Sequence, residues 1–151
     1  MTEIEKLIPE SKFLTLTRRK NGTLAIDGGV NFNGGIDPNS FFLRKGLAYV
    51  YVLDGEVIKI GETERTMSDR MKDYNRKRKS DSTEGRLMDE VWRSKKTIEV
   101  HIMYVENTIE FLGGEVLMNS SMLEQSLLQR YYSLFGRLPK LNFKMGWFMR
   151  R

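Results

Sequence analysis

Glu124 is the residue that most clearly suggests chemistry, because it is a carboxylate on the apolar side of an amphipathic segment. Between residues 120 and 135, apolar residues recur every three or four positions, and Glu124 falls on their side of the predicted helix. A carboxylate in that position is costly unless a cation or a metal ion is its partner. The alternative is a capping box with Ser121, which the three-residue spacing also allows.

Arg70 and Lys59 are two cations in segments that otherwise read as apolar. Arg70 lies on the helical face that carries Met71 and Tyr74, so its guanidinium needs a carboxylate or phosphate partner, or else reaches out to water. Lys59 interrupts an apolar strand, where the alternative is an edge-strand lysine that prevents aggregation. Together with the carboxylate, three such charges in one small domain favour a functional site.

The overall charge favours a polyanionic partner. Lys and Arg number 25 against 20 Asp and Glu, which gives a formal net charge of +5 and a sequence pI near 9.5. The basic residues cluster at 18–20, 76–79 and 150–151, with Arg86, Arg93, Lys95 and Lys96 on the next segment. Each cluster alone also fits a solvated surface.

The composition excludes several kinds of chemistry. With no cysteine, disulfides, zinc ribbons and thiol nucleophiles are ruled out. His101 is the only histidine, so it cannot form a histidine pair for a metal, and we expect a structural role for it. No apolar run is long enough to span a bilayer and no leader is visible, so a soluble cytoplasmic protein is expected.

The pattern predicts a single α/β (α+β) domain over residues 1–151. Residues 1–45 read as an irregular N-terminal arm with short strands, because Gly and Asn dominate there without sustained periodicity. The expected fold is a small central antiparallel sheet of about three strands flanked by helices. The expected elements are a hairpin of strands 47–53 and 56–61 around Asp54-Gly55, helices 66–78 and 83–94, strand 98–105 and helix 120–135.

Read in order, these residues resemble the motifs of the GIY-YIG nuclease superfamily. The first motif is Gly46-Leu47-Ala48-Tyr49-Val50-Tyr51, and the second is Lys59-Ile60-Gly61-Glu62-Thr63, followed by Arg70, Tyr74 and the late Glu124. Lys59 stands where most members have tyrosine, as in some GIY-YIG type II restriction endonucleases. The run 79–83 is similar to phage endonuclease II, although Glu84 replaces the lysine expected there unless Arg86 substitutes for it.

The resemblance implies a metal-dependent endonuclease that hydrolyses phosphodiester bonds in double-stranded DNA. Glu124 would bind one Mg²⁺ or Mn²⁺, Tyr49 would activate water with its pKa lowered by Lys59, and Arg70 would bind the scissile phosphate. A homodimer or homotetramer, in a bacterial or phage-infected cell, is expected because a double-strand cut usually needs two sites. The expected DNA contacts are Tyr51, Tyr74, Arg76, Lys77, Arg78, Lys79, Arg86 and Asn142.

The predicted hairpin raises a geometric difficulty. With a regular two-residue turn at Asp54-Gly55, Tyr49 would face Ile60, and Lys59 would project from the opposite face of the sheet. We therefore predict a longer loop or a β-bulge, using the φ freedom of Gly55. The rival functions are a non-catalytic DNA-binding module on the same scaffold, a structure-specific repair nuclease, and a protein with no nucleic-acid partner.

Overall fold

The computed structural model describes residues 1–76 except 22 and 27, then 87, 89, 90, 93, and 97–142 except 107. For 108–111 and 115–117 it describes the backbone alone. Most of the helix predicted at 83–94, and the expected DNA contacts Lys77, Arg78, Lys79 and Arg86, lie outside these residues. No helix in the described part of the chain has the length and apolar character that crossing a bilayer requires.

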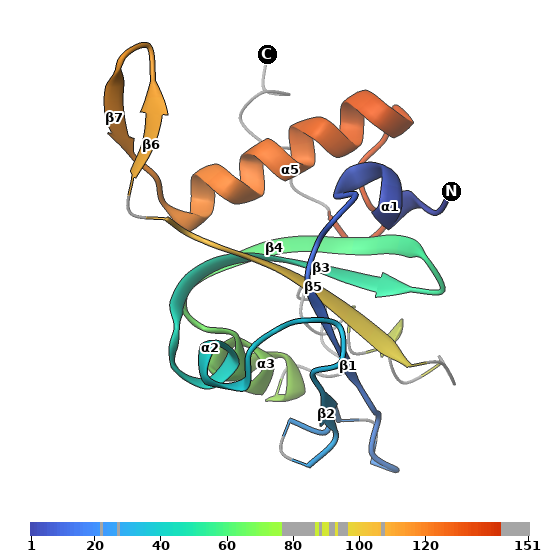
Figure 1. Ribbon diagram of the computed structural model, residues 1–151. Helices are drawn as coiled ribbons and strands as arrows, with labels where there is room; N and C mark the ends of the chain where they lie inside the picture. The colour runs from blue at the N-terminus through green and yellow to red at the C-terminus, as the bar shows by residue number, and fades with distance from the viewer. Residues whose placement is uncertain are drawn as a thin grey trace.

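A five-stranded antiparallel sheet forms the centre of the fold (Figure 1), with the strand order β2-β1-β5-β3-β4. Its strands are β1 (Phe13–Leu16), β2 (Val30–Asn31), β3 (Lys45–Leu53), β4 (Glu56–Thr66) and β5 (Ile98–Tyr104). The helices are α1 (Glu3–Leu7), α2 (Pro38–Leu43), α3 (Met67–Arg76) and α5 (Ser120–Phe135). The α+β class is confirmed, but the sheet is larger than the expected three strands because the N-terminal arm contributes β1 and β2.

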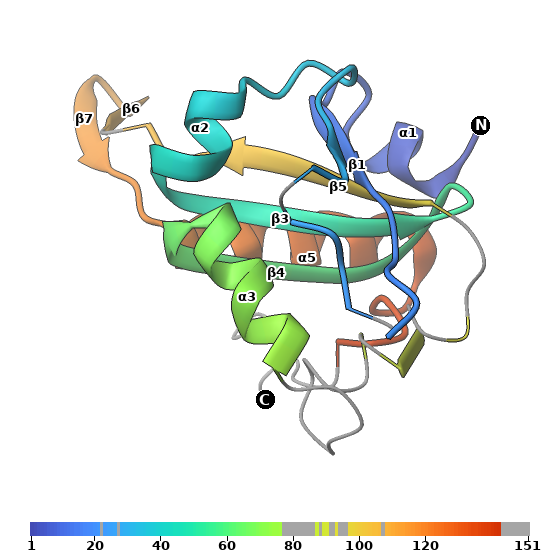
Figure 2. The ribbon, with the colours of Figure 1, turned by 90° about the horizontal axis from the view of Figure 1, so that it is seen from below.

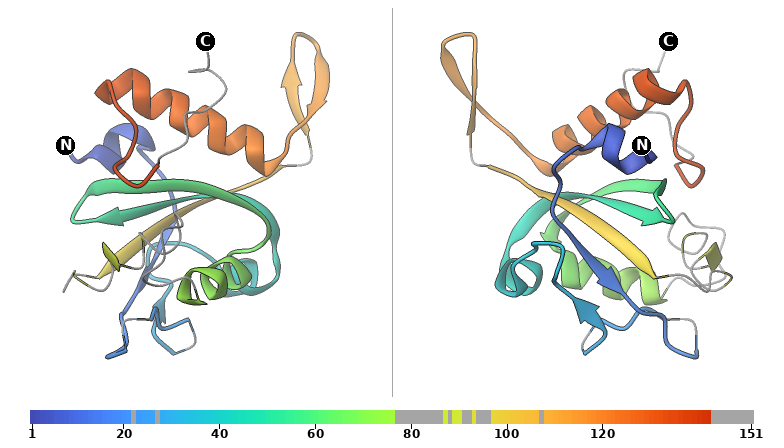
Figure 3. Two further views of the ribbon diagram at one scale, coloured as in Figure 1. Left: turned by 180° about the vertical axis from the view of Figure 1, so that it is seen from behind. Right: turned by 45° about the vertical axis from the view of Figure 1, so that its right-hand side comes forward.

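Helices cover both faces of the sheet. Figures 2 and 3 show α1 and α5 on one face of β3 and β4, with α2 and α3 on the other. Alternate residues of β3 belong to two separate cores: Ala48, Val50 and Val52 face α5, whereas Tyr49 and Tyr51 face α3. Burial on both faces explains why the hairpin sequence shows no clear polar alternation.

A second hairpin, β6 (Thr108–Phe111) with β7 (Gly114–Leu117), projects from the body of the molecule (Figure 3). The sequence analysis did not predict it. Its turn residues, Leu112 and Gly113, both have positive φ angles, 53° and 81°. A leucine in this conformation is uncommon, so the turn carries no sequence signal of the usual Asn-Gly kind.

The β3–β4 hairpin contains the predicted bulge, but at a different residue. Asp54 and Gly55 both have positive φ, 56° and 81°, and form a tight turn with Leu53 opposite Glu56. Val52 then pairs with Val57, but Tyr51 pairs with Lys59, so Ile58 is an extra residue in β4. The bulge restores the register that the site needs, because Lys59 now shares a face with Tyr51.

Helix α5 begins two residues earlier than a capping box at Ser121 would require. The N-cap is Asn119, whose side-chain oxygen accepts a hydrogen bond of 2.9 Å from the backbone N–H of Met122. The helix ends at Gly136, which adopts the left-handed conformation with φ 71°. Glu124 therefore lies inside the helix, and the capping-box alternative for it is wrong.

His101 ties the N-terminal arm to the centre of the sheet. It is buried in β5 opposite Phe13 of β1, on which its ring stacks with a centroid distance of 4.9 Å. Its Nδ1 bonds with the Ser11 hydroxyl and its Nε2 with the Glu99 carboxylate. Burial lowers the pKa of His101, with the hydrogen bond and charge of Glu99 opposing the shift. This pattern fits the structural role expected from the sequence.

Because the folded state disfavours the imidazolium, the free energy of unfolding should fall on acidification. The contribution of His101 is fully present above the unfolded pKa of about 6.5 and is lost as the pH falls from there toward the lower folded pKa. We expect urea unfolding to show this loss in the wild-type protein and a smaller loss in His101→Gln. The same pH dependence in both proteins would contradict this assignment.

Candidate active site

The hydroxyl of Tyr49 is the centre of the candidate site. The Tyr49 side chain is only 1% exposed, and its Oη lies 2.7 Å from the Oη of Tyr74 on α3. The Nε of Arg70 donates a second hydrogen bond to Tyr49 Oη at 3.0 Å. A buried hydroxyl is costly without partners, so these two contacts fix the phenol in place.

Arg70 is held against this pair of tyrosines and stays within reach of solvent. Its guanidinium lies over the Tyr74 ring, 4.6 Å from the centroid, and its Nη1 is 3.6 Å from Asp73 Oδ2. The side chain retains 19% exposure. Arg70 therefore does not extend freely into water, and its partly exposed planar cation suits a carboxylate or phosphate ligand.

Gly61 allows Tyr49 to reach the edge of the sheet. The two residues pair directly across β3 and β4, and β4 is the edge strand. A Cβ atom at position 61 would overlap Cζ and Oη of the Tyr49 ring. Any side chain here would therefore displace the phenol, which explains physically why the second motif has glycine at position 61.

Glu124 approaches the same edge strand from α5, on the opposite face. Its carboxylate is partly buried, and that burial raises its pKa. The positive charge of Lys59 opposes this shift most, the negative charge of Glu62 adds to it, and Arg70 also lowers it. Gln125 Nε2 donates a hydrogen bond of 3.2 Å to Glu124 Oε1. The structure thus brings the carboxylate into electrostatic contact with both predicted cations.

Lys59 is in the edge strand β4. This position also fits the alternative interpretation, an edge-strand lysine that prevents aggregation. The two interpretations are compatible, because its side chain is partly buried and its charge acts on Glu124. The structure therefore places Lys59 opposite Tyr51 and within electrostatic range of Glu124.

The pKa of Tyr49 shifts in the direction opposite to the one expected. Complete burial raises it, and the charge of Glu124 contributes in the same direction. Arg70 gives the largest opposing influence, followed by the hydrogen bond to Tyr74. The expectation that Lys59 lowers this pKa is therefore wrong for the protein alone: the cation that acts on Tyr49 is Arg70, and loss of hydration outweighs it.

Three of the residues expected to contact DNA are instead buried or bonded to the backbone. Tyr51 and Tyr74 are both 0% exposed, so neither ring has surface to offer to a duplex. Asn142 uses its amide on the edge strand, accepting from the N–H of Ile60 at 2.9 Å and donating to its C=O at 2.8 Å. The amide satisfies backbone groups that an edge strand leaves unpaired. It therefore fixes β4 at Ile60, the residue between Lys59 and Gly61.

The residues present suit one hard divalent cation. Among the described residues, no group of three or more histidine or acidic side chains could enclose a metal ion. Glu124 and Glu62 are nevertheless close enough to interact, and Ser120 Oγ donates to Glu62 Oε2 at 2.5 Å. Mg²⁺ is commonly held by one or two carboxylates together with waters and substrate phosphates. A partly buried carboxylate with a raised pKa is a suitable ligand.

Sequence reasoning did not assign roles to Gly61, Glu62 and Asp73. Asp73 contacts Arg65 and also bonds with Arg76 Nη2 at 2.6 Å. The three-residue spacing of Asp73 from Arg70 and Arg76 along α3 could have indicated this ion-pair cluster. Gly61 and Glu62 were quoted only as motif letters, since a close approach to a ring cannot be read from spacing.

Comparison with known proteins places this geometry beside two solved structures. Restriction endonuclease HPY188I in complex with product DNA superposes with a TM-score of 0.53 at 18% identity, covering 95% of this chain and 84% of that one. A mutant of EndoII from bacteriophage T4 gives a TM-score of 0.57 at 19% identity, covering 93% and 99%. The chain shares its fold with two nucleases. No family model and no curated protein matches the sequence.

The overlap at Gly61 leads to a test of how Tyr49 is positioned. We expect Gly61→Ala to lower the free energy of unfolding by roughly 1–3 kcal/mol, because the added methyl forces the buried phenol to move. Gly28→Ala is the matched control, since a Cβ there meets nothing within 4 Å, and its effect should stay within about 0.5 kcal/mol. Equal urea-unfolding midpoints for the two variants would exclude the proposed packing.

Proposed function

We propose that the protein is a metal-dependent endonuclease that hydrolyses phosphodiester bonds in double-stranded DNA. The observation that carries the proposal is the hydrogen bond between Arg70 and the buried hydroxyl of Tyr49 near the β4 edge, with the charge of Glu124 on α5 acting on both residues. The shared fold with two nucleases supports it. In one of these, the restriction endonuclease, the structure contains product DNA.

Hydrolysis of a phosphodiester requires an oriented water, neutralisation of the charge on the phosphoryl oxygens, and stabilisation of the departing 3′ oxygen. Arg70 is suited to the phosphoryl oxygens, because its guanidinium is partly exposed and is fixed by Tyr49, Tyr74 and Asp73. Lys59 adds positive charge on the same edge and favours the ionised form of Glu124. Both cations attract the anionic substrate to this edge.

Glu124 would hold Mg²⁺ or Mn²⁺, with Glu62 close enough to assist. When bound, the cation would polarise a phosphoryl oxygen, stabilise the leaving oxygen and add positive potential that favours the Tyr49 phenolate. In the protein alone Tyr49 is a neutral phenol at pH 7, since burial raises its pKa above the ordinary value near 10. For this hydroxyl to orient the attacking water, its 1% exposure must increase when DNA binds, and its basicity depends on the cations around it.

A double-strand cut needs two active sites, so we propose a homodimer or homotetramer as the working form on duplex DNA. The excess of basic residues, which includes the exposed Arg76 at the end of α3, supplies the charge that follows the phosphate backbone.

Glu124→Gln tests the metal-binding role. We expect nicking of supercoiled plasmid in Mg²⁺ or Mn²⁺ to fall at least about 100-fold, because the amide cannot hold a divalent cation as the carboxylate does. Affinity for DNA measured in a chelator should not fall. Glu5→Gln, an exposed change of the same kind on α1, is the control and should cut normally. Full activity of Glu124→Gln would rule out this role.

Tyr49→Phe tests the hydroxyl itself. We expect cleavage to fall by about 10²–10⁴-fold, because the variant keeps the ring but loses the group that orients the water and meets Arg70. Tyr132→Phe removes a hydroxyl from a 41% exposed tyrosine and should have no effect on cleavage. If the wild-type protein binds duplex and branched DNA but cuts neither with any divalent metal, the protein is a non-catalytic binding module instead.

A further inference from the structure

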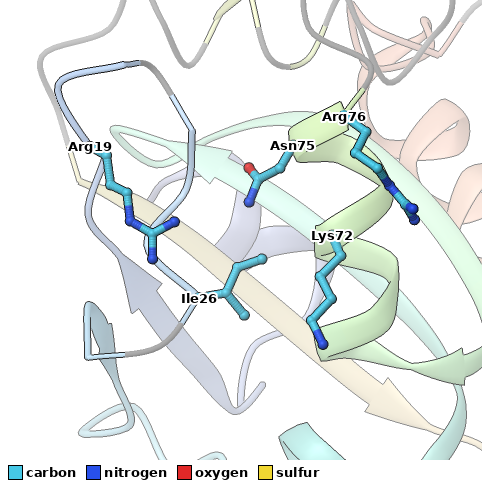
Figure 4. Close-up of a pocket in the computed structure, with 5 residues that line it drawn as sticks. All are labelled: Arg19, Ile26, Lys72, Asn75 and Arg76. Atoms are coloured by element: carbon cyan, nitrogen blue, oxygen red, sulfur yellow. The ribbon is translucent and has the colours of Figure 1, made fainter.

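A basic pocket separates the N-terminal arm from α3, away from the Tyr49 hydroxyl. Its volume is about 410 Å³, which is large enough for a phosphate with its attached sugar. Figure 4 shows Arg19 on the arm across from Asn75 and Lys72 on α3, with Ile26 between them, and Arg76 on the side of the helix away from Arg19. The five lining residues are Arg19, Ile26, Lys72, Asn75 and Arg76.

Specific hydrogen bonds hold the two walls of the pocket together. Asn75 accepts from the backbone N–H of Leu24 at 2.8 Å and donates to its C=O at 3.2 Å. The backbone N–H of Arg19 donates to Thr23 C=O at 2.8 Å, which closes the loop of the arm, and Ile26 is only 5% exposed. The pocket is therefore part of the folded structure. Ile26 forms its apolar floor, and the hydrogen bonds of Asn75 fix the distance between the arm and α3.

The charge of the pocket indicates an anionic ligand. Of the five described residues that line it, three are cations and none is acidic. The side chains of Lys72 and Arg76 are 59% and 71% exposed, so their charged ends remain accessible. Among the described residues, a carboxylate oxygen of Asp69 lies 4.0 Å from Lys72 Nζ, while Asp73 is shared among Arg65, Arg70 and Arg76. Lys72 and Arg76 therefore keep solvent-exposed charged ends while they also pair with carboxylates on α3.

We propose, resting on the proposed function, that this pocket binds a backbone phosphate of the DNA other than the scissile one. Arg70 and Arg76 are both on α3, and a rise of about 1.5 Å per residue separates them by roughly 9 Å along its axis. DNA presents a phosphate about every 3.4 Å of axis on each strand, so a duplex held at Arg70 offers further phosphates within reach. Asp73 contacts both arginines and couples the pocket to the candidate active site.

The role assigned to this pocket is positioning rather than reading of bases. Cationic side chains on phosphates set the register of a duplex on the protein without distinguishing sequence. The N-terminal arm would thereby take part in DNA binding through Arg19, which explains why its loop is fastened to α3 by Asn75. Loss of the pocket should weaken binding equally for different DNA sequences.

The test is fluorescence anisotropy with a labelled duplex in a chelator, over a series of salt concentrations. We expect Lys72→Glu to weaken binding about tenfold and to reduce the salt slope by about one per lost phosphate contact. Arg19→Gln and Lys72→Gln should weaken binding less, and they keep the test valid if the charge reversal prevents folding. Lys6→Glu, an exposed change on α1 across the sheet, is the matched control and should bind within about twofold of wild type.

The outcomes separate the pocket from the proposed function. If the wild-type protein binds and cuts DNA while the Lys72 and Arg19 variants keep its affinity and salt slope, the pocket inference is overturned and the nuclease proposal stands. If the wild-type protein does not bind DNA, both are overturned. Inorganic phosphate and a mononucleotide serve as further probes: saturable binding that depends on Lys72, with DNA affinity unchanged, would assign the pocket to a free phosphate compound.

Discussion

The extra residue in β4, Ile58, determines which side chains of the β3–β4 hairpin share a face. Without it, the tight turn at Asp54-Gly55 would place Lys59 on the α5 face, away from the tyrosines. With it, Tyr51 pairs with Lys59 and Tyr49 pairs with Gly61. A single inserted residue thus gives the Tyr49 ring its glycine neighbour and places Lys59 on the same face of the sheet as the tyrosines.

The second constraint is the burial of a polar tyrosine at that edge. Leaving a buried hydroxyl unsatisfied costs about 1–3 kcal/mol, and Tyr49 avoids this through Tyr74 and Arg70. Tyr51 lies beside them with a hydroxyl that has no hydrogen-bond partner in the described structure. Of these two buried tyrosines, only Tyr49 therefore has a hydroxyl whose direction is fixed by hydrogen bonds, from Arg70 and Tyr74. The same burial that fixes the hydroxyl also raises its pKa, so positioning and basicity oppose each other until cations are bound.

Local patterns in the sequence were sufficient to identify the hairpin, α3, β5 and α5, although β4 continues to Thr66, beyond the predicted end at residue 61. Helix α5 matches its predicted bounds, because its apolar periodicity is long and Gly136 ends it sharply. The strands of the arm were expected, but their place in the sheet was not, since the pairing of Phe13 with His101 depends on contacts between distant segments. The short helices α1 and α2 have too few turns to show a period.

The candidate site was predicted through charges in apolar surroundings: Arg70 contacts Tyr49, the charge of Glu124 acts on Tyr49, and the charge of Lys59 acts on Glu124. The sequence could not show which residues near the site are buried by other elements or are already hydrogen-bonded to the backbone. Tyr51 and Tyr74 were expected at the DNA surface, but α3 buries them, and the amide of Asn142 is used by the backbone of Ile60. Burial and hydrogen-bond partners depend on packing between elements that motif spacing does not specify.

The most direct measurement of the central claim is a crystal structure of the protein with Mn²⁺ and a short duplex, with anomalous scattering used to locate the metal. The account predicts a manganese peak at the Glu124 carboxylate, with a phosphate between it and Arg70 and with the Tyr49 hydroxyl facing the phosphorus. A metal bound elsewhere, or a phosphate backbone that passes the β4 edge without approaching Tyr49, would contradict it.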